Sequence, residues 1–293
     1  MRKVVILGAS GMLGHAVAAV MRDGEFELIL TSRPASAKLL PAFGKHLSFD
    51  ALSDEISDLG LDLNAGDFIV NCIGIIKPHI HDDNEGERKA AQLVNGLMPH
   101  KLSEYARSVG ARVIQIATDC VYSGATGGYV ETSPHDAHDV YGKTKSLGEV
   151  PSDCVMHLRV STIGPEQGRS TLLLEWVRSQ PVDATVNGYT DHLWNGITTK
   201  AFGRVVRGII ESENFVAGTH HIVPADQVSK DVLVADIAAA FDRTDIQVVP
   251  GASSKAIDRT LKTENVDFNA KLWNQAGYAA IPTIRELLAE ISA

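Results

Sequence analysis

The stretch that decides the fold lies near the N-terminus and reads VVILGASGMLG at residues 4–14. A short apolar run ends at a glycine and is followed at once by a helical pattern over 12–21. This order is typical of the first strand, turn and helix of a dinucleotide-binding unit. Gly8 permits the tight turn, Gly11 lets the backbone approach a pyrophosphate, and Gly14 lets the helix pack closely on the strand. The alternative is an ordinary glycine-rich turn in an α/β protein.

The backbone around this turn is also expected to hold phosphate. The first N–H groups of a helix lack partners within the helix, and the helix dipole is positive at that end. We therefore predict that Ser10, Met12 and Leu13 join the three glycines as contacts of a dinucleotide.

The second apolar run, at 27–31, is not followed by the acidic residue that binds a ribose hydroxyl in NAD sites. Ser32 and Arg33 stand there instead. Both are suited to donate hydrogen bonds to a 2′-phosphate, which favours NADP(H) over NAD(H); the alternative is that Arg33 is a solvated surface charge. Asp50, after the third apolar run, is either a contact of the adenine or a helix cap.

Further along the chain, apolar runs and helical patterns keep alternating, which predicts an α/β fold with a doubly wound parallel sheet of the Rossmann type. After Gly164 the alternation loosens into a predicted smaller C-terminal substrate-binding domain. We predict a polar loop at 187–195, helices near 199–211 and 229–242, a strand near 246–249 and a last helix at 284–291. We predict an NADP-binding domain at 1–163, to which a segment near 197–222 returns. The substrate-binding domain is predicted at 164–196 and 223–293.

The amino-acid composition and net charge argue against several classes of function. The 293 residues are 44% hydrophobic, and 36 acidic side chains outnumber 27 basic ones, giving a net charge of -9. This charge provides no basic field for nucleic acid or an anionic membrane surface, so local groups must hold any anionic ligand. Cys72, Cys120 and Cys154 form no CxxC pair, which argues against a disulfide framework. No apolar stretch approaches the roughly 18 residues of a membrane span, so we expect a soluble, cytoplasmic protein.

A second site is predicted from Tyr141 and Lys145, which lie four residues apart in a helical pattern and hence on one face. A free tyrosine titrates at about 10, and a nearby cation that stabilises the phenolate helps it to act as an acid at neutral pH. The apolar run at 113–118 ends in the hydroxyl of Thr118. Active-site residues of doubly wound sheets lie at such carboxyl ends of strands.

Together, GASGMLG at 8–14, TDCVYSG at 118–124, YGKTK at 141–145 and LRVSTIGP at 158–165 resemble an extended short-chain dehydrogenase/reductase. Within that superfamily the chain is most similar to the dTDP-4-dehydrorhamnose reductase group of nucleotide-sugar reductases. The resemblance implies that Tyr141 donates a proton, that Lys145 lowers the tyrosine pKa and binds the nicotinamide ribose, and that Thr118 bonds the carbonyl oxygen. It also implies cofactor contacts from Cys72, Ile73, Gly74 and Asn95.

The resemblance thus predicts NADPH-dependent reduction of a nucleotide-activated keto-sugar, of the 4-keto-6-deoxyhexose type. A homodimer is one possible assembly, although the sequence does not fix the oligomeric state. Two alternatives stay open: a non-catalytic NADP-binding regulatory subunit, and a nucleotide-sugar epimerase. Dehydratases of the superfamily carry an Asp-Glu pair after the threonine, whereas this chain has Asp119 and Cys120, which favours simple reduction. Cys120 is either a small buried filler or a counterpart of the epimerising cysteine of GDP-fucose synthase.

The substrate half departs from the family pattern at 187–199. Trp194 is predicted to stack on a base or sugar ring, with plain packing as the alternative. Arg259 is predicted to bind the diphosphate, with a surface ion pair as the alternative. His79 and His81 look like metal ligands, but no distant third ligand is indicated, so we predict a loop over the site and no metal.

Overall fold

The computed structural model of the protein describes residues 1–168 and 170–292. Its centre is a seven-stranded sheet in which each pair of neighbouring strands is parallel. From one edge to the other the strands are β3 (Lys45–Ser48), β2 (Phe26–Ser32), β1 (Arg2–Leu7), β4 (Phe68–Asn71), β5 (Arg112–Ala117), β6 (Val155–Arg159) and β11 (Gly218–His221). This order confirms the predicted doubly wound α/β fold.

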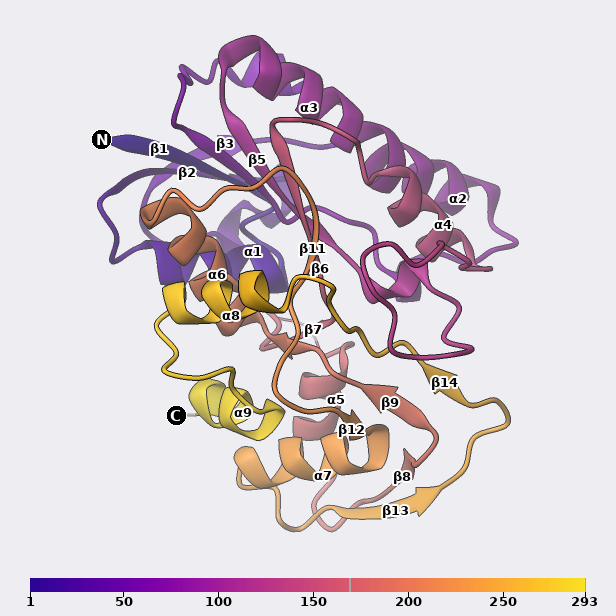
Figure 1. Ribbon diagram of the computed structural model, residues 1–293. Coiled ribbons are helices and arrows are strands. Elements are labelled where there is room, and N and C mark those ends of the chain that lie inside the picture. The colour runs from indigo at the N-terminus through magenta and orange to yellow at the C-terminus, as the bar shows by residue number, and fades with distance from the viewer. Residues whose placement is uncertain (169, 293) are drawn as a thin grey trace.

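Helices cover both faces of the sheet (Figure 1). Alternate residues of β1 belong to different cores, because side chains along a strand point to opposite faces. Val4 and Ile6 pack with α1 (Met12–Met21), α6 (Thr199–Glu211) and α8 (Val266–Gln275). Val5 and Leu7 pack with α3 (Met98–Val109), which follows α2 (Glu85–Ala91) and a π-helical turn at Gln92–Leu97.

The chain returns to the main sheet after leaving it. Strand β7 (Thr162–Ile163) pairs with β10 (Ile197–Thr198), and α6 then packs against α1. A Cβ on Gly203 would lie 3.1 Å from a methyl group of Val20, so this glycine allows the two helices to approach closely. The following strand, β11, extends the sheet beside β6.

The remaining C-terminal elements surround a core of their own, drawn in the lower part of Figure 1. They are α5 (Leu173–Arg178), β8 (Thr185–Tyr189), β9 (His192–Trp194), β12 (Val228–Ser229), α7 (Lys230–Ala240), β13 (Gln247–Gly251), β14 (Ile257–Asp258) and α9 (Ile284–Ser292). Strand β8 pairs with β13, and β9 lies between β12 and β14. None of the helices formed by the described residues is both long and apolar enough to cross a membrane.

The prediction of a polar loop at 187–195 was wrong. Strand β8 extends to Tyr189 with alternating exposed and buried residues, and β9 begins at His192. The turn between them is short, so most of the stretch is strand. Gly188 is required there, because a Cβ would lie 2.5 Å from the backbone of Asp231 on α7. The polar composition therefore marks half-exposed strands.

Candidate active site

A cleft of about 740 Å³ runs along the carboxyl ends of β1, β2, β4 and β5, where ligands of doubly wound sheets bind. Most of the residues predicted for the cofactor and for catalysis line it: Gly8, Ser10, Gly11, Met12, Leu13, Ser32, Arg33, Asp50, Cys72, Ile73, Gly74, Thr118, Tyr141 and Lys145. The cleft thus brings the first glycine turn and the tyrosine helix into one cavity.

The glycine turn has the shape that a dinucleotide cradle needs. Gly8 has a φ of +79°, which side-chain-bearing residues rarely adopt, and a Cβ there would lie 2.9 Å from the Ile73 side chain. A Cβ on Gly14 would lie 2.3 Å from the carbonyl oxygen of Gly8, so the helix sits directly on the turn. Gly14 does not line the cleft. Its absent side chain instead allows helix α1 to approach the turn at Gly8. These residues fit a bound pyrophosphate.

The groups predicted for the adenosine half line the same cleft. Ser32 is 4% exposed, whereas Arg33 is exposed and makes no side-chain hydrogen bond or ion pair within the described part of the chain. The carboxylate of Asp50 accepts a hydrogen bond of 3.0 Å from the backbone of Leu52. Asp50 therefore caps a local turn and also lines the cleft, which leaves both of its interpretations in place.

Asn95 lies in the π-helical turn and does not line the cleft. Its side chain, 2% exposed, accepts a hydrogen bond from the Ile75 N–H at 2.8 Å and donates one to the Ile75 carbonyl at 2.9 Å. It also donates to the Thr144 hydroxyl at 3.3 Å. In this structure Asn95 therefore ties the loop after Gly74 to the tyrosine helix.

Helix α4 (Val140–Leu147) carries Tyr141 and Lys145 and is fixed at its start. The Asp139 carboxylate accepts a hydrogen bond of 2.8 Å from the Gly142 N–H and pairs with Lys77 of the overlying loop at 2.7 Å. A Cβ on Gly142 would lie 2.2 Å from the Cys120 carbonyl oxygen. The absence of a side chain at Gly142 thus lets Tyr141 approach the end of β5.

Burial shapes the protonation of this pair. Lys145 is 7% exposed, and desolvation lowers its pKa to about 8 while Glu149 opposes the shift. Burial raises the pKa of Tyr141 above its ordinary value, and hydrogen bonding with Thr118 is the main opposing influence. The lowering of the tyrosine pKa expected from Lys145 is not found here, because desolvation is the largest influence on this pKa and raises it. The phenol is therefore protonated at neutral pH, the form that a proton donor needs.

Two thiols border the same cleft. Burial raises the pKa of Cys72 and of Cys120 to about 12. Both stay protonated at neutral pH, and a thiol is a poor base compared with a thiolate. This protonation favours the interpretation of Cys120 as a small buried filler.

Asp119 follows Thr118, lines the same cleft and is 9% exposed. Burial raises the pKa of Asp119, while Arg259 and Lys230 act in the opposite direction. The Arg259 guanidinium is held by a 2.8 Å hydrogen bond from its Nε to the Tyr122 carbonyl. Lys230 was not predicted, because it lies more than a hundred residues from Asp119 in the sequence and belongs to no recognisable motif.

Trp194 is 5% exposed and belongs to the C-terminal core, with its indole N–H donating to the Ser161 hydroxyl at 2.8 Å. Of the two interpretations that the sequence left open, this geometry favours packing over stacking on a ligand. Tyr189 is 44% exposed and lies against the His192 ring, with 4.7 Å between the centroids. The stacking role predicted for Trp194 thus has no exposed ring face to carry it.

His79 and His81, the two histidines predicted to lie in a loop over the site, have different surroundings. His79 lines the cleft, whereas the His81 ring bonds to Glu87 at 2.7 Å, which raises the pKa of His81. Among residues 1–168 and 170–292, no group of three or more His, Cys, Asp or Glu side chains is arranged to hold a metal ion.

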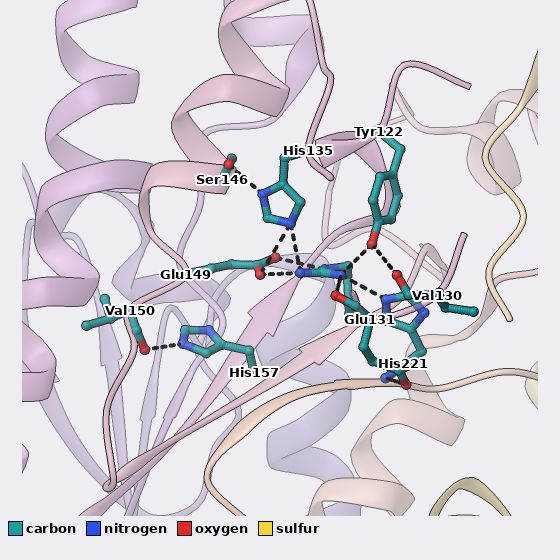
Figure 2. A network of polar contacts seen from close by, with 10 residues as sticks. Tyr122, Val130, Glu131, His135, Ser146, Glu149, Val150, His157 and His221 are labelled. Atoms are coloured by element: carbon teal, nitrogen blue, oxygen red, sulfur yellow. Dashed lines mark hydrogen bonds and ion pairs between the residues drawn. The ribbon is translucent and has the colours of Figure 1, made fainter. Parts of the chain in front are cut away.

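A buried polar network fixes the segment after β5 to the rest of the sheet (Figure 2). Its centre is Arg159, 2% exposed, whose guanidinium pairs with Glu149 beyond the end of α4. The same group contacts the hydroxyl of Tyr122 at 2.5 Å and the rings of His135 and His221 at 2.9 Å. The network therefore joins α4, β6, β11 and the segment that carries Asp119, and so sets their relative positions.

Comparison with known families identifies the class of protein. The model of the RmlD substrate binding domain family matches residues 1–293, and the chain belongs to this family. This membership agrees with the extended short-chain dehydrogenase/reductase fold predicted from the motifs.

The sequence identity to individual curated relatives is low. The dTDP-4-dehydrorhamnose reductase of Mycobacterium tuberculosis H37Rv is 30% identical over 154 residues, 50% of this chain and 44% of that protein. Methionine adenosyltransferase 2 subunit beta of Danio rerio is 25% identical over 268 residues, 85% of this chain and 77% of that protein. The chain thus spans less than half the length of the reductase relative that it matches.

Solved structures share the fold. A dTDP-4-dehydrorhamnose reductase from Clostridium acetobutylicum superposes with a TM-score of 0.73 at 20% identity, covering 99% of this chain and 98% of that one. MoeE5, solved with UDP-glucose and NAD, gives a TM-score of 0.74 at 19% identity, covering 100% of this chain and 97% of that one.

Proposed function

We propose that the protein reduces a nucleotide-activated keto-sugar with NADPH, and that the sugar is of the 4-keto-6-deoxyhexose type. The observation that carries this proposal is the single cleft that contains both the glycine turn and the pair Tyr141 and Lys145. The M. tuberculosis relative, a dTDP-4-dehydrorhamnose reductase, supports the substrate class.

The residues around the turn fit a nicotinamide dinucleotide. Gly8 allows the tight turn and Gly14 lets helix α1 pack directly on it, which is the shape that a pyrophosphate cradle needs. Ser32 and Arg33 line the same cleft and are available to donate to a 2′-phosphate. A structure related by fold, the dTDP-4-dehydrorhamnose reductase of Bacillus anthracis, was solved with NADP. When bound, the reduced nicotinamide supplies the hydride for the carbonyl carbon.

The chain's own residues handle the proton and the developing charge. Tyr141, protonated at neutral pH, gives its phenolic proton to the carbonyl oxygen of the sugar. Thr118 donates a hydrogen bond to the same oxygen, and the Lys145 ammonium stabilises negative charge nearby. A well-placed donor of this kind contributes about 3 to 4 kcal/mol to a transition state. The burial of Lys145 strengthens its effect, since charges interact more strongly where water is excluded.

We propose that residues 164–196 and 223–293 form the substrate-binding part, with 1–163 and the returning segment 197–222 holding the cofactor. The separate core around α7 supports this division. A homodimer is a further prediction, supported by the exposed apolar side chains of Leu97 and Leu147. The two lie near one another, since a Cβ on Gly96, the neighbour of Leu97, would lie 3.6 Å from the Leu147 Cβ. Light scattering of the purified protein tests it, and a monomeric mass would contradict it.

The proposed activity is tested by mixing the protein with NADPH and a panel of nucleoside-diphosphate 4-keto-6-deoxyhexoses. Absorbance of the reduced nicotinamide is followed, and we expect oxidation that depends on the sugar. Binding of NADPH with no oxidation across the panel would overturn the proposed activity.

A non-catalytic regulatory role is the second candidate, favoured by the long match to methionine adenosyltransferase 2 subunit beta. The presence of Thr118, Tyr141 and Lys145 in one cleft argues for catalysis, since a pure cofactor sensor needs no proton donor. An epimerase is the third, and the protonated Cys120 argues against it. An epimerase would interconvert sugars without net oxidation of NADPH.

A further inference from the structure

Lys230 is a basic residue in the substrate half that the proposed mechanism does not use. It is the first residue of α7, and β12, which precedes it, pairs antiparallel with β9 so that Val228 lies opposite Trp194. The Lys230 ammonium nitrogen lies 5.3 Å from the centre of the Trp194 ring. The Trp194 indole in turn bonds to Ser161, which lines the cleft. Two strands therefore hold Lys230 beside the active site.

The surroundings of Lys230 destabilise the charged form of its side chain. The side chain is half-buried, and within residues 1–168 and 170–292 its ammonium has neither a hydrogen bond nor an ion pair. Burial lowers its pKa to about 8, while Asp119 and Cys120 act in the opposite direction. Apart from the Trp194 ring, this ammonium has no partner among the described residues that satisfies its N–H groups. A buried polar group with unsatisfied donors is destabilising, so a ligand that accepts hydrogen bonds from it fits the arrangement.

We propose that Lys230 and Asp119 together bind a hydroxyl-bearing edge of the sugar ring and thereby orient the ring toward Tyr141. This inference rests on the proposed function and names the part of the substrate that the site recognises. A sugar hydroxyl accepts a hydrogen bond from the ammonium and donates one to the carboxylate, so it satisfies both groups.

The alternative occupant of the same spot is the diphosphate. Arg259, anchored on the Tyr122 carbonyl, is the other cation that acts on Asp119 and is the better diphosphate ligand, since its fork of donors matches phosphate oxygens. This donor chemistry assigns the diphosphate to Arg259 and leaves Lys230 for the sugar.

The test compares binding of dTDP-glucose and of dTDP, each in the presence of NADP⁺, by calorimetry; UDP-glucose and UDP serve if the uridine nucleotides bind more tightly. In Lys230→Met we expect affinity for the nucleotide sugar to fall about tenfold or more, the usual effect of losing a hydrogen bond to a charged group. Affinity for the free nucleotide should stay within about twofold. Lys230→Arg keeps the charge and should recover most of the sugar affinity.

Lys255→Met is the matched control, because Lys255 is an exposed lysine of the same half of the chain. It should leave both affinities unchanged. The melting temperature of the free Lys230→Met protein should equal or exceed that of the wild type, since a half-buried charge with no ion-pair partner in the described part of the chain is removed.

Three results would overturn the inference alone: unchanged sugar affinity, an equal loss for sugar nucleotide and free nucleotide, or a loss of affinity accompanied by a lower melting temperature. The second would assign Lys230 to the diphosphate and the third would make it structural. If the wild type binds neither nucleotide sugar, the proposed function fails and this inference fails with it.

Discussion

The ammonium of Lys145 donates a hydrogen bond of 2.9 Å to the backbone carbonyl of Ile116. This bond ties helix α4 to strand β5 two residues before Thr118, so the lysine has a structural partner as well as its proposed catalytic one. Because α4 also carries Tyr141, the phenol and the Thr118 hydroxyl are held against the same strand end. The relative position of the proposed donors is therefore built into the folded protein before any ligand binds.

Arg33 gives a direct test of cofactor preference. Removing its guanidinium in Arg33→Gln should weaken NADPH binding by about tenfold or more, the scale of a lost charge-assisted hydrogen bond. NADH lacks the 2′-phosphate, so its affinity should not change. Fluorescence titration with each cofactor measures both values.

Lys38→Gln is the matched control, since Lys38 is a nearby exposed cation that does not line the cleft. It should leave both affinities unaltered. If Arg33→Gln and Lys38→Gln bound NADPH equally well, the assignment of the 2′-phosphate to Arg33 would be lost.

The pH dependence of turnover should report Lys145. Its pKa of about 8 means that the ammonium loses its proton as pH rises above that value. Tyr141, whose pKa is raised, stays protonated over the same range. We therefore expect kcat/KM to fall on the alkaline side with an apparent pKa near 8, because this parameter reports ionisations of the free enzyme.

Lys230 has a similar pKa of about 8, so the same profile must be measured in Lys230→Met. Persistence of the alkaline fall in that variant assigns it to Lys145. Lys143→Met, on the exposed side of α4, should leave the profile as in the wild type. A profile flat to about pH 10 would show that no group titrating near 8 is needed.

Acid should destabilise the fold through His221. Burial and the nearby Arg159 lower its pKa to about 4, against an ordinary value of 6.5. Between these values the unfolded chain binds a proton that the folded protein does not, so the free energy of unfolding falls as pH falls. From about pH 7.5 to about pH 5 this group alone accounts for about 2 kcal/mol.

Urea denaturation of His221→Gln at the same two pH values should show a smaller decrease, by about that amount. His138→Gln, at an exposed histidine, should keep the decrease of the wild type. Equal decreases in wild type and His221→Gln would remove His221 as the source.

Much of the fold was predictable because local signals and tertiary structure agree. The apolar run before Gly8 and the helical pattern after Gly11 became β1 and α1, and the 199–211 pattern became α6. Strand β8 was missed because its polar, half-exposed face resembles a loop when the sequence is read without its partner β13. Pairing of that kind is decided by contacts far apart in the sequence.

The site was predictable where short motifs carry it and not where it depends on long-range packing. Tyr141 and Lys145 are one helical turn apart, so their common face follows from spacing alone. Lys230 approaches Asp119 only because β12 pairs with β9, which no local pattern indicates. The packing of Trp194 likewise depends on a distant partner, the hydroxyl of Ser161.

The most direct test of the central claim is the rate of NADPH oxidation by wild type and Tyr141→Phe with a nucleoside-diphosphate 4-keto-6-deoxyhexose. Removing the phenolic proton should lower kcat by about 100-fold or more, the usual effect of losing a general acid, while NADPH affinity stays nearly unchanged. Turnover by Tyr141→Phe close to that of the wild type would contradict the account.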